Sequence, residues 1–202
     1  LRWYQQWGAA GANWLMQHPE IVEKDFVLTN ASGAHAVPIS EHIIGMLLVF
    51  ARQLHRAQSN QRQHLWKGFA QAELFELAEK TMVLIGVGAI GERTARIAAA
   101  LDMRVLGVRR NPSKAVPAVE AMYGPDQLLE ILPEVDIVVI TAPLTDETRA
   151  MIGPDELRAM KPSAYLVNIG RGGIIQEEAL IWALQEGWIA GAGLDVFATE
   201  PL

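Results

Sequence analysis

The sequence predicts an α/β protein whose core is a doubly wound parallel sheet, preceded by part of a second, smaller lobe. From Thr81 onward, strand-like runs that are apolar throughout alternate with helical patterns. Such strands are buried on both faces by covering helices, which favours parallel pairing. A glycine-rich turn joins the first strand to the first helix, as in a Rossmann-like sheet. The strands are expected at Met82–Val87, Arg104–Val108, Asp136–Thr141, Ala164–Ile169 and Ala192–Val196, and the helices at Glu92–Leu101, Gln127–Leu132, Asp155–Met160 and Glu177–Glu186.

The first eighty residues follow a different pattern. Leu1–Trp7 and Phe26–Thr29 are short strand-like runs, and helix-start signals at Pro38 and Ser40 precede one long helical pattern from Glu41 to about Leu65. We therefore expect residues 1–38 to be part of a smaller substrate lobe and residues 39–202 to form the sheet domain, incomplete at its carboxyl-terminal end. The first lobe is short, so we also expect the chain to lack an amino-terminal part.

Composition narrows the class of protein. A formal net charge of −6 over 202 residues argues against nonspecific nucleic-acid binding, and the lack of cysteine excludes disulfides and thiolate chemistry. The longest apolar run, Ile43–Ala51, is about half the length of a membrane span. No secretory signal begins the chain, and no histidine and carboxylate spacing suggests a metal. A cytoplasmic protein without a metal, nucleic-acid or membrane partner is expected.

The glycine-rich turn is the first candidate site. Gly86, Gly88 and Gly91 have the G-x-G-x-x-G spacing after a strand and before a helix, which predicts a dinucleotide site on the helix amino end. The first glycine permits the tight turn, the second the approach of a pyrophosphate, and the third close helix packing. Ala89 and Ile90 belong to the same loop. The alternative is a glycine-rich turn that binds nothing.

The end of the second strand indicates which dinucleotide is bound. An acid about 20 residues after the glycines would hold the ribose 2′-hydroxyl of NAD. Here that strand is followed by Arg109 and Arg110, and guanidinium groups suit a 2′-phosphate. We predict NADP, with NAD as the second candidate cofactor. The alternative is a solvated basic turn.

Three further side chains follow the last two strands. Arg171, flanked by glycines, is well placed to reach a substrate carboxylate, although a loop salt bridge is an equal alternative. Asp195 and Glu200 could orient a base or accept a hydrogen bond from a carboxamide, although surface acids are the simpler interpretation. The pairs Asp146–Glu147 and Glu177–Glu178 are interpreted as charges at helix amino ends.

Together these motifs resemble the NAD(P)-dependent D-2-hydroxyacid dehydrogenases, in the branch of the glyoxylate and hydroxypyruvate reductases. The resemblance covers nearly the whole chain. It includes the glycine turn, Leu1 to Gln6 with Ala10 to Ala12, Thr29 to Gly33, Ile39 to Ile43, Pro143 to Arg149, Val167 to Gly172, Leu194 to Phe197 and Glu200 to Leu202. The resemblance implies hydride transfer between a nicotinamide and a small 2-keto acid.

The resemblance also implies roles for individual residues. Arg171 would hold the keto acid and stabilise charge on its carbonyl oxygen, and Glu200 would partner a catalytic histidine. Asp195 would lie near the nicotinamide carboxamide. The backbone of Ala10 and Gly11 would bind the substrate carboxylate. The cofactor would also be lined by Ala142, Pro143, Ile169 and Gly170.

Two departures from the family pattern matter. Arg109 replaces the usual ribose-binding acid, which supports NADP. The family's acid/base histidine lies beyond the Glu200–Leu202 motif, and none of the five histidines here matches it: His18, His35, His42, His55 and His64. We therefore expect a fragment that is inactive alone. The alternatives are a nucleotide-sensing binding module, or an enzyme with another hydride donor such as formate or phosphite. A homodimer through the long helix is expected.

Overall fold

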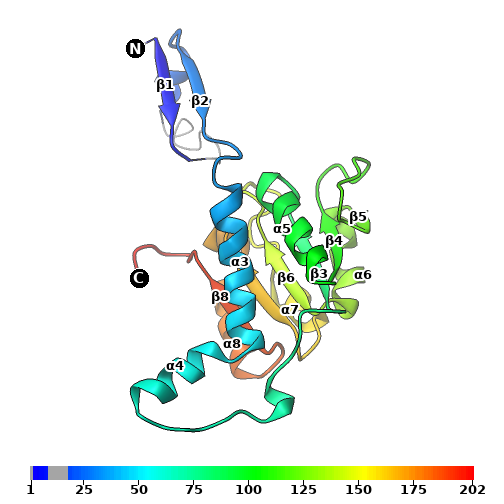
Figure 1. Cartoon of the computed structure of the whole chain (residues 1–202). Helices are drawn as coiled ribbons and strands as arrows, with labels where there is room; N and C mark the ends of the chain where they lie inside the picture. Colours follow the sequence, from blue (N-terminus) through cyan, green and yellow to red (C-terminus); the bar gives the residue numbers. More distant parts are fainter. Residues whose placement is uncertain (1, 9–17) are drawn as a thin grey trace.

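The computed structural model describes residues 2–8 and 18–202. Its main feature is a six-stranded sheet with the order β5-β4-β3-β6-β7-β8, in which every neighbouring pair is parallel (Figure 1). Counted from β3, this is the strand order of a doubly wound dinucleotide fold. The fold class is therefore confirmed. The strands are β3 Thr81–Ile85, β4 Arg104–Val108, β5 Ala121–Tyr123, β6 Ile137–Ile140, β7 Tyr165–Asn168 and β8 Gly191–Leu194.

Helices cover both faces of this sheet. Helices α3 (Ala36–Ala51) and α5 (Ala89–Ala100) pack on one face, where Met82 and Leu84 of β3 join their cluster. Helices α6 (Leu128–Ile131), α7 (Pro154–Ala159) and α8 (Glu177–Gln185) cover the other, where Val83 and Ile85 lie. Successive strand residues point to opposite faces, and both faces are buried. This explains the continuous apolar runs.

The elements missed by the sequence analysis are short ones. Strand β5 is an edge strand of three half-buried residues, which leaves no pattern in the sequence. The helix expected at residues 127–132 is instead three short pieces, namely the 3-10 turns η2 (Pro125–Gln127) and η3 (Leu132–Glu134) with α6 between them. Pro133 has no N–H for the α-helical ladder, so the helix cannot continue.

The amino-terminal strands form a separate two-stranded parallel sheet. Strands β1 (Trp3–Gln6) and β2 (Val27–Asn30) pair in register, and the short helix α2 (Pro19–Val22) lies between them in the chain. Figure 1 shows this small sheet beyond the amino end of α3, apart from the main sheet. The loop with Ala10 and Gly11 lies outside the described residues. The lobe boundary at residue 38 remains a prediction, and it falls inside α3.

The expectation of one long helix from Glu41 to Leu65 is wrong. Helix α3 ends at Ala51, and α4 (Leu54–Arg62) continues at an angle of 67°. Gln53 has a left-handed backbone conformation with φ of 53°, which breaks the helical ladder. In the described part of the chain, no single helix is long and apolar enough to cross a membrane, and α3 with α4 meets that test only as this bent pair.

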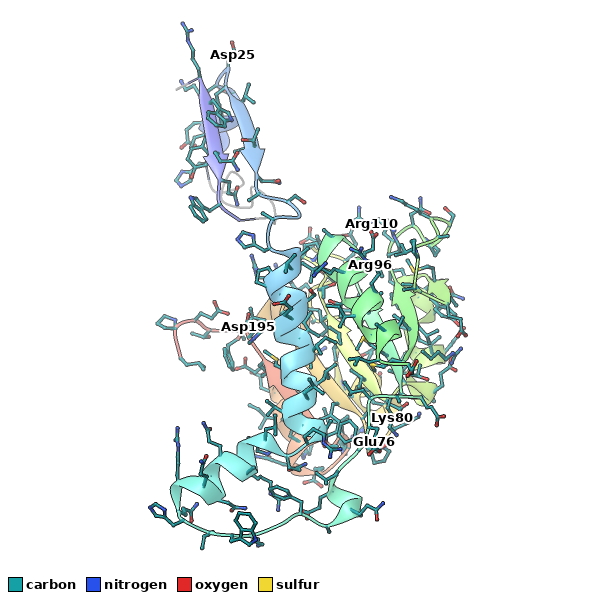
Figure 2. All side chains as sticks on the ribbon, viewed as in Figure 1. Asp25, Glu76, Lys80, Arg96, Arg110 and Asp195 are labelled. Carbon is teal, nitrogen blue, oxygen red and sulfur yellow. The ribbon has the colours of Figure 1, made fainter. Side chains whose placement is uncertain are left out.

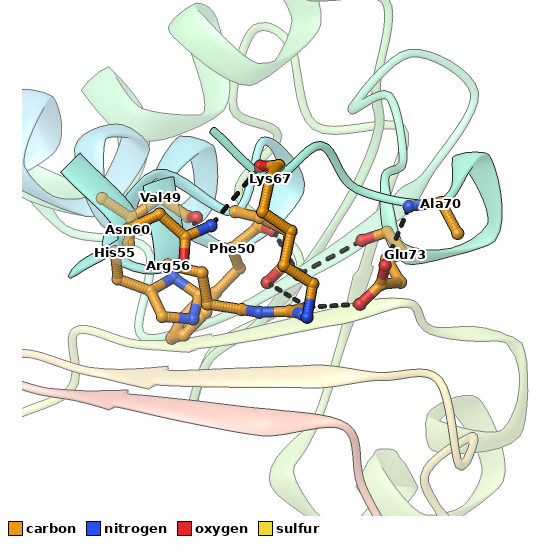
Figure 3. Close-up of polar contacts among 9 residues, drawn as sticks. Val49, Phe50, His55, Arg56, Asn60, Lys67, Ala70 and Glu73 are labelled. Carbon is orange, nitrogen blue, oxygen red and sulfur yellow. Dashed lines mark hydrogen bonds and ion pairs between the residues drawn. The ribbon is translucent and has the colours of Figure 1, made fainter. Parts of the chain in front are cut away.

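The segment after α4 folds back onto that helix. Figure 3 shows the contacts, which centre on Glu73 in the 3-10 turn η1 (Gln71–Glu73). Arg56 pairs with its carboxylate, which also accepts a hydrogen bond from the Ala70 N–H at 2.8 Å. Asn60 donates to the Lys67 carbonyl at 3.4 Å. These bonds tie the connection to α4, and Trp66 within it is fully exposed.

Candidate functional site

The candidate residues that the structure describes gather at the carboxyl edge of the main sheet. Gly86 follows β3, Arg109 follows β4, Ala142 follows β6, Ile169 follows β7 and Asp195 follows β8. The strands are parallel, so these ends all meet at one edge. The order of the chain reverses between β3 and β6, and open α/β sheets bind ligands in the crevice at such a point.

Two glycines of the loop are required by packing within the protein. Gly86 has φ of +94°, and a Cβ atom there would lie 2.6 Å from the Ala142 nitrogen. At Gly91 a Cβ atom would lie 2.5 Å from the Gly86 carbonyl oxygen, which also accepts a hydrogen bond from the Thr141 hydroxyl. The close contact of α5 with β3 therefore depends on these two glycines.

Gly88 is different, because none of the described residues requires a glycine there. Its φ is −97°, and a Cβ atom would meet no atom of residues 2–8 and 18–202 within 4 Å. It forms the N-cap of α5, a helix of 12 residues, so free N–H groups and the positive dipole end adjoin this open space. Ala89 beside it is exposed and Ile90 is half-buried. The loop leaves room for a phosphate to approach the backbone.

The two arginines after β4 have different surroundings. The Arg109 N–H donates to the Tyr123 carbonyl at 3.1 Å, and within residues 2–8 and 18–202 its half-buried side chain has no hydrogen bond or ion pair. Arg110 is exposed, and its Nη2 lies 3.3 Å from Oε2 of Glu147. One guanidinium at the edge is therefore unpaired and the other is shared with a carboxylate.

Glu147 does not begin a helix, so that part of the sequence interpretation is wrong. Residues 146–150 form a turn after β6, and Glu147 accepts a hydrogen bond from the Thr145 hydroxyl at 2.7 Å. This hydroxyl, the Glu147 backbone and Arg110 hold the pKa of its carboxyl below the ordinary value. The Glu147 carboxylate was not among the predicted site residues. Its contact with Arg110 joins two distant segments, so no local sequence pattern could indicate it.

The loop with Arg171 is held by a buried asparagine. Asn168 is fully buried, accepts a hydrogen bond from the Gly170 N–H and donates one to the Arg171 carbonyl, each at 3.0 Å. Arg171 Nη1 donates to the Gly170 carbonyl at 2.7 Å, and its exposed side chain forms no ion pair with a described carboxylate. The sequence signals for Asn168 were a polar residue at the end of an apolar strand and its place in the Val167 to Gly172 motif, and neither showed which groups it bonds.

The last candidates follow β8. The Asp195 N–H donates to the Asn168 carbonyl at 3.0 Å, and its half-exposed carboxylate lies 3.4 Å from Nε2 of His42 on α3. Glu200 is exposed and accepts a hydrogen bond from the Phe197 N–H at 2.9 Å. The structure thus brings His42, one of the five histidines that do not match the acid/base position of the family, to Asp195. Of the remaining predicted residues, Ala142 and Ile169 are buried and Pro143 is exposed. Across residues 2–8 and 18–202, no three side chains are grouped to hold a metal ion.

A glycine turn at a helix amino end, at the switch point of a doubly wound sheet, defines a dinucleotide-binding domain. The comparisons agree. Residues 44–202 match the family described as D-isomer specific 2-hydroxyacid dehydrogenase, NAD binding domain. The chain therefore belongs to the D-isomer specific 2-hydroxyacid dehydrogenase family, and the family assignment made from the sequence is confirmed.

Individual relatives are similar over most of this chain. A glyoxylate reductase of Thermococcus gammatolerans is 46% identical over 182 residues, which are 87% of this chain and 52% of the relative. A family member of known structure from Aeromonas salmonicida has a TM-score of 0.89 at 33% identity, covering 100% of this chain and 63% of that one. An NADPH-dependent glyoxylate/hydroxypyruvate reductase of Sinorhizobium meliloti, solved with NADP and sulfate, has a TM-score of 0.84 at 26% identity, covering 100% and 63%. The chain spans about half the length of the curated relatives it matches.

Proposed function

We propose that this chain forms the cofactor-binding half of an NADP(H)-dependent 2-keto acid reductase, acting on a small acid such as glyoxylate or hydroxypyruvate. One observation carries the proposal. The open space at Gly88 and the exposed Arg171, which has no carboxylate partner among the described residues, lie at the same edge of the sheet. A pyrophosphate site and a carboxylate-binding cation would therefore share one edge of the sheet. The named relatives are reductases and a family member, and they give no support to a binding module without activity.

The preference for NADP(H) rests on Arg109. Its guanidinium forms no hydrogen bond or ion pair with another described side chain, so it can bind a dianionic phosphate without first breaking an ion pair. No carboxylate stands at its position to accept a hydrogen bond from a ribose 2′-hydroxyl. The named relative that was solved with NADP supports this assignment.

When bound, the nicotinamide would supply a hydride to the keto carbon of the substrate, and the family's acid/base histidine would supply the proton to its oxygen. Arg171 would bind the substrate carboxylate and stabilise negative charge on the carbonyl oxygen. Asn168 keeps this loop in place, because it donates a hydrogen bond to the Arg171 carbonyl and accepts one from the Gly170 N–H. Asp195 would accept a hydrogen bond from the carboxamide and so orient the ring. Glu200 would hold the acid/base histidine of the family in its protonated form.

The lobe assignment, the location and the oligomeric state are parts of the same proposal. Residues 1–38 would belong to a substrate lobe, since their two-stranded sheet does not join the main sheet. We propose a cytoplasmic homodimer. The exposed apolar side chains on and after α4 support the dimer, because Leu54, Leu65 and Trp66 are 49%, 52% and 105% exposed.

Cofactor binding and hydride transfer are tested separately. Titration of the 202-residue chain with NADPH and NADH should give saturable binding that is tighter for NADPH. For activity, this chain replaces the matching half of the Thermococcus gammatolerans relative in a chimaera, which is assayed with glyoxylate by the loss of NADPH absorbance. Turnover that is lost in Arg171→Ala while NADPH binding persists supports the proposal. Turnover that survives Arg171→Ala contradicts it.

A further inference from the structure

We propose that Glu147 tunes the cofactor preference of this site, because its carboxylate occupies Arg110 in competition with a ribose 2′-phosphate. The inference rests on the proposed NADP(H) site. Glu147 lies in the turn after β6, whereas Arg109 and Arg110 follow β4. Glu147 would weaken binding of the phosphorylated dinucleotide and leave binding of the unphosphorylated one unchanged.

The first support is the position of the ion pair. Arg110 follows β4 and Glu147 lies in the turn after β6, and these strands flank β3 on its two sides. The contact of 3.3 Å between Nη2 and Oε2 therefore spans the end of β3, from which the glycine loop begins. Figure 2 shows Arg110 at this edge of the domain. A dinucleotide lying on the glycine loop has to meet this pair.

The second support is that the carboxylate is held in place from its own side. Oε2 of Glu147, the atom that contacts Arg110, also accepts the hydrogen bond from the Thr145 hydroxyl. The turn is closed by Thr148, whose hydroxyl accepts from the Thr145 N–H at 2.8 Å and donates to the Pro143 carbonyl at 2.7 Å. Glu147 is thus positioned whether or not Arg110 is paired, and it remains beside any anion that Arg110 takes.

The third support is electrostatic. A 2′-phosphate that reaches Arg110 must share it with Glu147 or displace it, and like charges at short range repel. A 2′-hydroxyl carries no charge, so NADH does not experience this repulsion. Arg110 and Glu147 are 79% and 68% exposed, so water and salt weaken the effect. Exposed pairs of this kind correspond to about a two- to fivefold change in an equilibrium constant.

The test measures dissociation constants of NADPH and NADH for the complete 202-residue chain by calorimetry. Glu147→Gln removes the charge and keeps the shape, and Asp146→Asn is its matched control. Asp146 is the adjacent exposed acid, and it forms no hydrogen bond or ion pair with another described side chain. Glu147→Gln should strengthen NADPH binding about two- to fivefold and leave NADH binding unchanged, whereas Asp146→Asn should change neither constant.

A double-mutant cycle shows whether Glu147 acts through Arg110. In an Arg110→Gln background, Glu147→Gln should lose most of its effect on NADPH binding. An unchanged NADPH constant in Glu147→Gln, an equal shift in Asp146→Asn, or a full effect without Arg110 would each overturn the inference. Failure of the NADP(H) proposal is distinguishable, because Arg109→Gln would then leave the ratio of the two constants unchanged.

Discussion

Two substitutions in the glycine loop should separate a glycine required by the fold from one required by a ligand. In Gly91→Ala the new Cβ atom lies 2.5 Å from the Gly86 carbonyl oxygen, which belongs to the backbone. In Gly88→Ala it enters space with no atom of the described residues within 4 Å, at a backbone conformation that alanine adopts freely. The two variants carry the same chemical change within one loop and one helix start, so each is the control for the other.

The expected effects on the free energy of unfolding differ between the two variants. Ordinary contact begins near 3.4 Å, so Gly91→Ala must push α5 away by about 1 Å, and overpacking of this kind costs about 1–3 kcal/mol. Alanine's better helix propensity returns up to about 1 kcal/mol, which leaves a net loss of stability. Gly88→Ala should change the free energy of unfolding by less than about 1 kcal/mol, because alanine restricts the unfolded chain but is a poorer N-cap than glycine.

In Gly88→Ala, NADPH binding should weaken although the free energy of unfolding changes little. A methyl group in the space where a pyrophosphate approaches the backbone removes at least one charge-assisted hydrogen bond, about 1.5–3 kcal/mol, or roughly a 10- to 100-fold weaker NADPH constant. Urea denaturation and calorimetry measure the two quantities on the same samples. The reasoning is refuted if Gly88→Ala is as unstable as Gly91→Ala, or if it binds NADPH as tightly as the unchanged chain.

Three further outcomes are expected. Arg109→Asp should reverse the preference for NADPH over NADH, since it replaces the unpaired cation with an acid suited to a 2′-hydroxyl, and an unchanged ratio in calorimetry would contradict the 2′-phosphate role. Asn168→Ala should lower the free energy of unfolding by about 2–3 kcal/mol, because both bonds of a fully buried amide to the backbone are lost, and a urea midpoint within error of the unchanged chain would contradict this. Trp66→Asp should convert a dimer to a monomer in light scattering, and a monomeric unchanged chain would exclude the proposed interface.

The sequence was most informative where one physical requirement leaves a local pattern. Strand β4 was predicted to the residue, because burial on both faces demands the run of four apolar or small residues that follows Arg104. The glycine loop was equally clear, since a tight turn and a close helix contact each admit only glycine at Gly86 and Gly91. The break at Gln53 was missed because no proline or glycine marks it. Strand β5 was missed because three half-buried edge residues carry no period.

By itself, then, the sequence determined the parallel sheet, the family and the set of residues that follow each strand. Only the tertiary structure decided how those residues are partnered. Glu147 contacts Arg110, which lies 37 residues away in the chain. His42 contacts Asp195, which lies more than a hundred residues away. Burial of a strand and the geometry of a turn constrain residues that are adjacent in the sequence, so they leave short sequence patterns. Contacts between charges at the edge of a sheet depend on which strands lie side by side, and that order exists only once the chain has folded.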